Sequence, residues 1–218
     1  MSRPVIIVVG AGPGVSGSVA RCFADGGYDV GLLGQDQQVL DDLVPDLEAR
    51  GATVGHAVVD ITDEQAAREA VRRLGEHAGR IDVVHFNPSA FRAKDPLTLT
   101  VAELLEDVAL GVGALLTAVQ AARPFMSAGG RVSVTGSVAA DDPWEGAASL
   151  GVQKAGVRNL VHSLDKQLAP DGIRAVSVTV HGALSREGAF TPDRVAGSIW
   201  SAVTRDAAEW TSEVHHRG

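Results

Sequence analysis

The sequence is poor in cysteine and in aromatic residues. Its 218 residues include one cysteine, Cys22, and one tyrosine, Tyr28, and aromatic residues make up 4% of the chain. A single cysteine excludes an intramolecular disulfide framework, and Cys22 falls on the apolar side of a predicted helix, where we expect a buried, unreactive thiol. We therefore expect a protein of the reducing cytoplasm.

Long apolar runs and an excess of basic residues are also absent. No apolar run approaches the ~20 residues that a membrane-spanning helix needs, and a strand is predicted from residue 5, so we expect no signal peptide. Lys and Arg total 19 against 27 Asp and Glu, which gives a formal net charge of −8. This charge disfavours nucleic acid and anionic membranes as partners, and no metal site is predicted.

The sequence does contain a regular alternation of strand and helix patterns. Apolar runs predict strands at 5–9, 28–33, 53–59, 81–86, 131–135, 173–180 and 209–215. Helical periodicity predicts helices from residue 15 and at 36–50, 63–78, 100–126, 145–168 and 192–203. This alternation predicts an α/β fold, a doubly wound parallel sheet of about seven strands with helices on both faces. No linker or repeat interrupts it, so residues 1–218 are expected to form a single domain.

The longest predicted helix, 100–126, has an apolar stripe that we expect to be buried. Its members are Leu104, Leu105, Val108, Leu115, Leu116 and Val119.

A glycine-rich turn, Gly10-Ala11-Gly12-Pro13-Gly14, joins the first strand to a helical pattern that starts at Val15. Glycines let backbone N–H groups approach a ligand that a Cβ would block. The start of a helix also offers unpaired N–H groups and a positive dipole end to an anion. The letters Gly12-x-Gly14-x-x-Gly17 match the dinucleotide pattern. A plain strand–helix turn is the alternative, because the chain has 25 glycines.

Further motifs follow this turn in a characteristic order. They are Gly10-x-x-x-Gly14-x-Ser16, Asp60, Phe86-Asn87-Pro88-Ser89, the segments 130–137 and 154–157, and His181-Gly182. Taken together, these motifs resemble the short-chain dehydrogenase/reductase family over nearly the whole chain. The resemblance implies a Rossmann-type fold and an oxidoreductase that uses NAD or NADP on a small carbonyl or alcohol substrate. It also implies a homodimer or homotetramer that pairs through the two long helices.

The resemblance assigns cofactor contacts to a defined set of residues. These are Gly10, Gly12, Gly14, Val15, Ser16, Gln35, Asp60, Ile61, Asn87 and Lys154. Ser16 replaces a family glycine, and its hydroxyl would either bond a pyrophosphate or crowd it.

The choice between NAD and NADP stays open in the sequence. Gly34 stands where an acidic residue would favour NAD, and Gln35 stands where an arginine would favour NADP. The Gln35 amide can donate to a hydroxyl or to a phosphate. Asp36 would repel a 2′-phosphate if it pointed inward, but it is also a good helix cap.

Only two of the family's four catalytic residues are retained, Ser137 and Lys154. Leu150 stands where the family's tyrosine transfers a proton, and the helix 100–126 contains no asparagine. Leucine cannot transfer a proton, a step that typically contributes ~10²–10⁴-fold to the rate.

His181 is the candidate replacement for the missing proton donor. It lies at the carboxyl end of a predicted strand, and a histidine pKa suits proton transfer near neutrality. A histidine bonded to backbone at a strand end is the alternative. His85, in contrast, is expected to face a packed helix.

The altered site leaves more than one function open. An oxidoreductase with an unusual proton donor is one hypothesis, and a catalytically impaired NAD(P)-binding pseudoenzyme with a structural or regulatory role is another. A non-redox enzyme on this fold and a chain that has lost cofactor binding are further alternatives. Only residues 183–191 separate the sixth strand from the next helix, and so short a lid would leave the crevice open to water.

Overall fold

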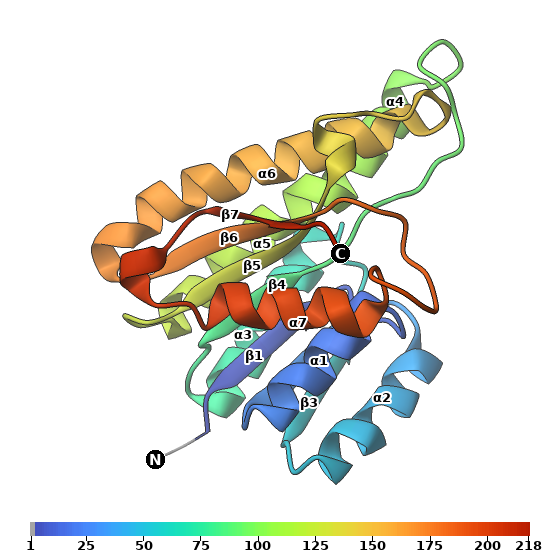
Figure 1. Ribbon diagram of the computed structural model, residues 1–218. Coiled ribbons are helices and arrows are strands. Elements are labelled where there is room, and N and C mark those ends of the chain that lie inside the picture. The colour runs from blue at the N-terminus through green and yellow to red at the C-terminus, as the bar shows by residue number, and fades with distance from the viewer. Residues whose placement is uncertain (1–2) are drawn as a thin grey trace.

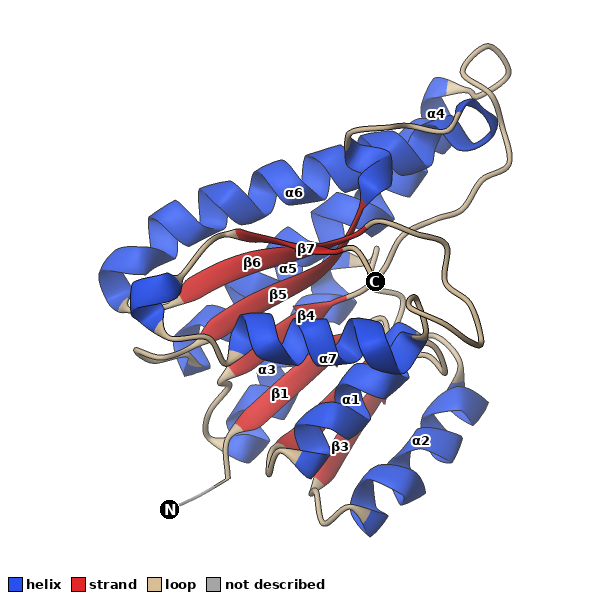
Figure 2. Cartoon of the chain, in the orientation of Figure 1, coloured by secondary structure: helices blue, strands red, loops and turns tan. Residues whose placement is uncertain are grey.

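A parallel β-sheet of seven strands forms the centre of the computed structural model, which describes residues 3–218 (Figures 1 and 2). The spatial order is β3-β2-β1-β4-β5-β6-β7, and every neighbouring pair is parallel. The strands are β1 (Val5–Val9), β2 (Asp29–Gly34), β3 (Val54–Val58), β4 (Val83–Phe86), β5 (Arg131–Ser137), β6 (Arg174–Val180) and β7 (Glu213–His216). The predicted doubly wound α/β fold is confirmed.

Helices cover both faces of the sheet. One face carries α1 (Val15–Asp25), α2 (Gln37–Ala49) and α7 (Pro192–Val203). The other carries α3 (Glu64–Ala78), α5 (Ala114–Ala122) and α6 (Ala148–Leu168), with α4 (Val101–Val108) packed against α6. Among residues 3–218, no helix has the length and apolarity to cross a membrane.

The burial of the central strand β1 on both faces explains why the first apolar run in the sequence is continuous. Val5, Ile7 and Val9 point into the cluster under α3 and α5, whereas Ile6 and Val8 point into the cluster under α1 and α7. A strand buried on both faces needs apolar side chains at every position. The chain leaves β1 towards β2 on one side and returns to β4 on the other, so a crevice opens at the carboxyl ends of β1 and β4.

The predicted helix 100–126 is interrupted. A π-helical turn, Ala109–Gly113, separates α4 from α5, and a 3₁₀ turn follows at Arg123–Phe125. Because the wider turn rotates α4 relative to α5, one apolar stripe cannot face the core along both helices. Leu115 and Val119 are buried as expected, but Leu105 and Leu116 are 61% and 40% exposed.

Several element ends differ from the sequence-based boundaries. Residues Glu145–Ala147 form a 3₁₀ turn before α6, and β7 starts at Glu213. Strand β7 also extends one residue beyond the predicted strand 209–215, to His216. That residue pairs with Val180 and is only 8% exposed, and its Nδ1 lies 2.7 Å from the Ser198 hydroxyl of α7.

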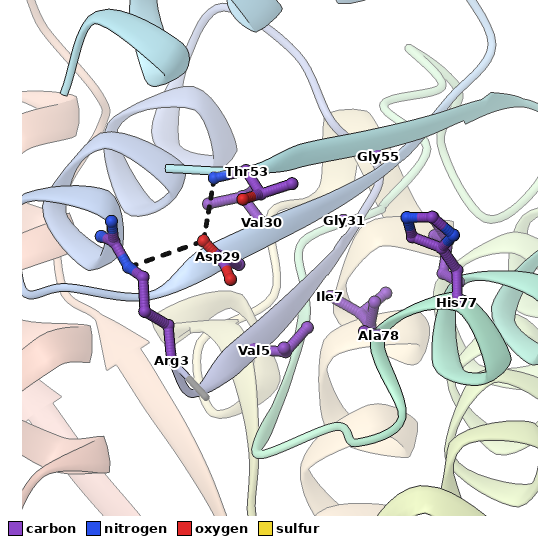
Figure 3. A pocket seen from close by; sticks show the side chains of 11 residues that line it. Arg3, Val5, Ile7, Asp29, Val30, Gly31, Thr53, Gly55, His77 and Ala78 are labelled. Carbon is purple, nitrogen blue, oxygen red and sulfur yellow. Dashed lines mark hydrogen bonds and ion pairs between the residues drawn. The ribbon is translucent and has the colours of Figure 1, made fainter. Parts of the chain in front are cut away.

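A small pocket lies at the amino ends of the strands, opposite the crevice. Gly31 of β2 and Gly55 of β3 are neighbours in register, and a Cβ on Gly55 would come within 2.8 Å of Leu74. The missing side chains let α3 approach the sheet and leave a pocket of about 240 Å³. Figure 3 shows its rim, where Asp29 accepts a hydrogen bond from the Thr53 N–H at 2.8 Å and lies 3.5 Å from the Arg3 guanidinium. The charged side chains at the rim, Arg3 and Asp29, therefore form an ion pair with each other.

The buried histidine of β4 predicts a pH dependence of stability. His85 is fully buried, its Nδ1 lies 2.9 Å from the Ser133 hydroxyl, and burial lowers its pKa to about 3. The unfolded chain binds this proton below about pH 6.5, whereas the folded chain does not. The neutral imidazole therefore makes its full contribution to the free energy of unfolding above pH 6.5. This contribution decreases as the pH falls, and about 2 kcal/mol of it is lost at pH 5.

The measurement is urea unfolding between pH 7 and pH 5. His85→Phe keeps a ring that does not titrate, so its unfolding free energy should fall less with acid than that of the wild type. His77→Phe, at an exposed histidine, should keep the wild-type slope. Equal slopes for the wild type and His85→Phe would contradict the assignment.

Candidate functional site

A pocket of about 340 Å³ lies in the crevice at the carboxyl ends of the strands. It combines the β1–α1 turn, the end of β2, the residues after β3 and the loop after β4. Its lining includes Gly10, Ala11, Gly12, Pro13, Gly34, Gln35, Asp36, Ile61, Pro88 and Ser89. Four predicted cofactor residues, Gly10, Gly12, Gln35 and Ile61, thus share one cavity.

The β1–α1 turn has the backbone that its glycines require. Gly10 has a φ of +79°, and a Cβ there would lie 2.5 Å from the Pro88 ring. Gly14 precedes α1 without a side-chain cap, and no atom lies within 4 Å of where its Cβ would be. The space beside Gly14 at the start of α1 is therefore open, as a phosphate bound at a helix start requires.

Ser16 closes this turn from inside. The side chain is 2% exposed, and its hydroxyl accepts a hydrogen bond from the Gly12 N–H at 3.0 Å. The hydroxyl therefore stabilises the turn and does not project into the space above Gly14. The sequence left open whether this hydroxyl bonds a pyrophosphate or crowds it. Its position inside the turn supports neither role.

The part of the pocket that follows β2 and β3 carries carboxylates and an amide. Gln35 donates to Asp60 at 3.2 Å, and Asp60 also accepts from the Thr62 hydroxyl at 2.7 Å and from its N–H at 2.9 Å. The bonds from Thr62 lower the pKa of Asp60. Asp36 accepts from the first amides of α2, which is the capping role considered for it. No lysine or arginine lines this part of the described structure.

Lys154 of α6 lies against strand β5. It is 6% exposed, and its ammonium donates to the carbonyl of Thr135 in β5 at 2.9 Å. Burial lowers its pKa to about 8. No carboxylate among residues 3–218 forms an ion pair with it. A buried cation without a counter-ion is typical of a functional site.

Ser137 and Leu150 flank this lysine. Ser137 ends β5, and its hydroxyl accepts from the Ala139 N–H at 3.2 Å, which leaves the hydroxyl proton for another acceptor. Leu150 precedes Lys154 by about one turn of α6 and is partly buried. Asn87 follows β4, and its N–H donates to the Val9 carbonyl at 3.1 Å. The carboxyl ends of β4 and β5 thus place Asn87 and Ser137 on the same edge of the sheet.

His181 directly follows the last residue of β6, and its ring contacts β7 and not β5. Its Nε2 is 2.8 Å from Nδ1 of His215, and its N–H donates to the His216 carbonyl at 2.9 Å. The imidazole therefore turns towards β7, whereas Ser137 belongs to β5. Burial, and then the charge of Arg217, lower the pKa of His181. The described contacts do not join His181 to Ser137 or Lys154.

Gln153 is a site residue that sequence reasoning missed. It is fully buried, accepts from the Ala90 N–H at 2.8 Å and donates to the Ala90 carbonyl at 3.1 Å. A Cβ on Gly111 would lie 2.4 Å from its side-chain oxygen, so the π-helical turn makes room for this amide. The signal in the sequence is Gly111 itself, a glycine inside the predicted helix 100–126, where the family has an asparagine and this chain has none.

An ion-pair network fixes the loop after β4 and was also missed. Arg92 donates to both oxygens of Asp107 at 3.0 and 2.9 Å, and Ser149 of α6 donates to the same carboxylate at 2.6 Å. Asp107 is 3% exposed, and the hydrogen bonds from Arg92 lower its pKa. One buried carboxylate therefore ties the loop to α4 and α6.

A doubly wound parallel sheet with a glycine turn, an open helix start and a crevice at the strand-order reversal defines a dinucleotide-binding fold. The family model described as short chain dehydrogenase matches residues 4–186. The chain therefore belongs to the short-chain dehydrogenase family, as its motifs predicted.

Curated relatives and solved structures agree with this membership. Sulfoacetaldehyde reductase 2 of Chromohalobacter salexigens is 28% identical over 215 residues, which cover 96% of this chain and 84% of the relative. An uncharacterized oxidoreductase of Listeria monocytogenes is 23% identical and covers 93% of this chain and 91% of its own length. A short chain dehydrogenase from Burkholderia cenocepacia, solved in complex with NADP, aligns with a TM-score of 0.89 at 25% identity, over 100% of this chain and 96% of that one.

Proposed function

We propose that the chain is an NAD(P)-dependent oxidoreductase that reduces a small carbonyl compound or oxidises the corresponding alcohol. The observation that carries this proposal is the buried Lys154 ammonium, which lacks a counter-ion and lies beside the strand that ends in Ser137. Sulfoacetaldehyde reductase 2, at 28% identity, supports a small aldehyde as the substrate class. The nicotinamide, when bound, supplies the hydride.

The chain's own residues divide the remaining tasks. The amides at the start of α1 and the Gly10–Gly14 turn bind the pyrophosphate, and Gln35 and Asp60 bind the adenosine end. Ser137 uses its free hydroxyl proton to hold the substrate oxygen, because its oxygen already accepts from Ala139. Lys154 bonds the ribose and keeps a proton close to the reacting oxygen.

Lys154 is also a better replacement than either His85 or His181 for the proton donor that the family's tyrosine supplies. His85 has a pKa of about 3, so at neutral pH it is a neutral imidazole and lacks the acidic proton of an imidazolium. The imidazole of His181 turns to His215 and away from β5, which leaves its role as proton donor with less support. A lysine with a pKa of about 8 can donate a proton at physiological pH.

A second function, a dinucleotide-binding pseudoenzyme, is favoured by one observation. The family's asparagine is expected near residues 109–111, where this chain has Ala109, Leu110 and Gly111, and the buried amide of Gln153 fills the space beside Gly111. Together with Leu150, this removes two of the groups through which the family moves protons. Such a chain would bind the dinucleotide tightly and turn over no carbonyl or alcohol.

The assigned role of Lys154 predicts the pH profile of carbonyl reduction. With NADH and a panel of small aldehydes, kcat/KM should be constant below pH 8 and fall as the ammonium deprotonates above it. Lys154→Met should lower kcat by roughly 10²–10⁴-fold, and Lys154→Arg should move the break to higher pH. Stopped-flow absorbance in the band of reduced nicotinamide measures both the pH profile and the kcat of the variants.

Lys166→Met, a change at an exposed lysine of the same helix, is the control and should leave the profile unchanged. A flat profile with full activity in Lys154→Met would contradict the role. If the wild type binds NADH without turnover while Leu150→Tyr gains turnover, the pseudoenzyme is the correct function.

We also propose a preference for NAD over NADP. The adenosine end of the pocket contains Asp36, lies beside Asp60 and has no lysine or arginine in its described lining, so a 2′-phosphate would find no cation there. NADH should bind about tenfold or more tightly than NADPH, as measured by fluorescence titration. Gln35→Arg should reduce the difference, and Gln35→Leu should not. Equal affinities in the wild type would exclude the preference.

We propose a homodimer that pairs through α4, α5 and α6. Val101, Leu105 and Val152 are 73%, 61% and 48% exposed on these helices, and water-exposed apolar side chains favour association. Sedimentation velocity should give a dimer for the wild type and a monomer for Leu105→Glu combined with Val152→Glu. Val58→Glu, at a residue on β3 that is also 48% exposed, should stay dimeric. A monomeric wild type would contradict the proposal.

A further inference from the structure

The start of α6 supplies three buried polar side chains to three other segments. Ser149 donates to a carboxylate of α4, Lys154 donates to a carbonyl of β5, and Gln153 bonds the loop after β4. This loop runs beside the start of α6 on its way to α4 (Figure 1), and the Ala148 N–H donates to its Lys94 carbonyl at 3.1 Å. The proposed function gives Lys154 a role and gives Gln153 none.

The amide of Gln153 bonds both backbone groups of one residue in this loop. Its oxygen accepts from the Ala90 N–H at 2.8 Å, and its nitrogen donates to the Ala90 carbonyl at 3.1 Å and to the Ser149 carbonyl at 3.2 Å. The Gln153 side chain is fully buried. Its amide therefore holds Ala90 as a neighbouring strand would, and its loss would leave two backbone groups without their partner.

Residues next to these contacts line the cofactor pocket. Ser89, which directly precedes Ala90, lines the pocket, and so does Leu110 of the π-helical turn. Gly111 follows in that turn, and a Cβ on it would lie 2.4 Å from the side-chain oxygen of Gln153. Gln153 thus sets two parts of the pocket wall, the loop after β4 by hydrogen bonds and the π-helical turn by contact.

Gly111 and Gln153 are complementary in size. A Cβ on Gly111 would also lie 2.9 Å from Cγ and 3.0 Å from Cβ of Gln153, so the turn cannot carry a side chain while α6 carries the amide. The family has an asparagine in the helix that corresponds to 100–126. In this chain, an amide reaches the space beside the π-helical turn from α6 instead.

We propose that Gln153 is a positioning residue for the dinucleotide. Its amide holds the loop after β4 and the π-helical turn in the arrangement that receives the dinucleotide, and it acts through Ala90 without touching the reacting atoms. This role rests on the proposed function, because it takes the pocket as a dinucleotide site. A wall that is ordered before binding raises affinity, since the ligand binds only molecules whose wall has the bound arrangement.

Gln153→Leu keeps most of the side-chain volume and removes the bonds to Ala90. We expect the Kd for NADH, measured by fluorescence titration of the full chain, to rise about tenfold, as for a wall that is ordered in roughly one molecule in ten. A variant that only folds less well would bind fewer equivalents of NADH with the wild-type Kd. Gln167→Leu, at an exposed glutamine of the same helix, is the matched control and should keep the wild-type Kd.

Gln153→Glu tests the hydrogen bonds without a change of shape. Its carboxylate can accept from the Ala90 N–H, but it has no proton for the Ala90 carbonyl. Burial raises the pKa of a carboxyl, so acid restores the missing donor. The ratio of its Kd to that of the wild type should fall by about threefold or more between about pH 9 and pH 6. The same ratio for Gln153→Leu should stay constant.

An exchange of the two residue types tests their shared space. Gly111→Asn alone should weaken NADH binding, because its side chain meets the amide of α6, and Gln153→Gly alone should weaken it through loss of that amide. The double variant carries the amide on the π-helical turn, so we expect it to bind NADH more tightly than either single variant.

An unchanged Kd in Gln153→Leu, or a ratio for Gln153→Glu that does not vary with pH, would overturn the positioning role. Turnover of aldehydes by the wild type would still support the oxidoreductase in that case. A raised Kd in Gln153→Leu without turnover by the wild type would contradict the oxidoreductase and support the positioning role. A double variant that binds more weakly than both single variants would show that the two positions do not share one space, and would also overturn the proposal.

Discussion

The reversal of strand order between β1 and β4 is the constraint on which the site depends. Crossover helices cover the faces of the sheet, but the connections leave β1 in opposite directions, so nothing covers the carboxyl ends of these two strands. The glycine turn after β1, Asn87 after β4 and Ser137 at the end of β5 all lie at this edge of the sheet. The contact between Gly10 and the Pro88 ring sets how closely the first two of these segments approach.

The sequence predicted the sheet well because its central strand β1 is buried on both faces and reads as an uninterrupted apolar run, and because apolar residues dominate the other buried strands. It predicted the cap Asp36 for a local reason, since a capping side chain bonds amides two or three residues away. It failed for the helix 100–126, because the π-helical turn exists to accommodate Gln153, more than 40 residues away. Contacts between distant segments leave no periodic signal in the sequence.

The same limit applies to the candidate site. Ser137 and Lys154 were proposed from their positions in the motifs. For the other candidates, the direction of the side chain decides whether they belong to the site. His181 stands at the predicted strand end, yet its ring bonds His215. Ser16 stands in the predicted turn, yet its hydroxyl faces inward to Gly12. The burial of Lys154 without a counter-ion, the strongest feature of the site, depends on the packing of α6 on β5 and is not visible in sequence.

The shared carboxylate of Asp107 restrains one side of the crevice. The loop after β4 cannot move alone, because its opening would separate Arg92 from a buried carboxylate that Ser149 also holds, and a buried unpaired charge is costly. The segment after β6 has weaker ties, such as the bond from the Ser185 N–H to the Phe190 carbonyl at 3.1 Å. In kinetic terms, we expect one wall of the crevice to stay fixed during turnover, while substrate and product exchange with solvent past residues 183–191.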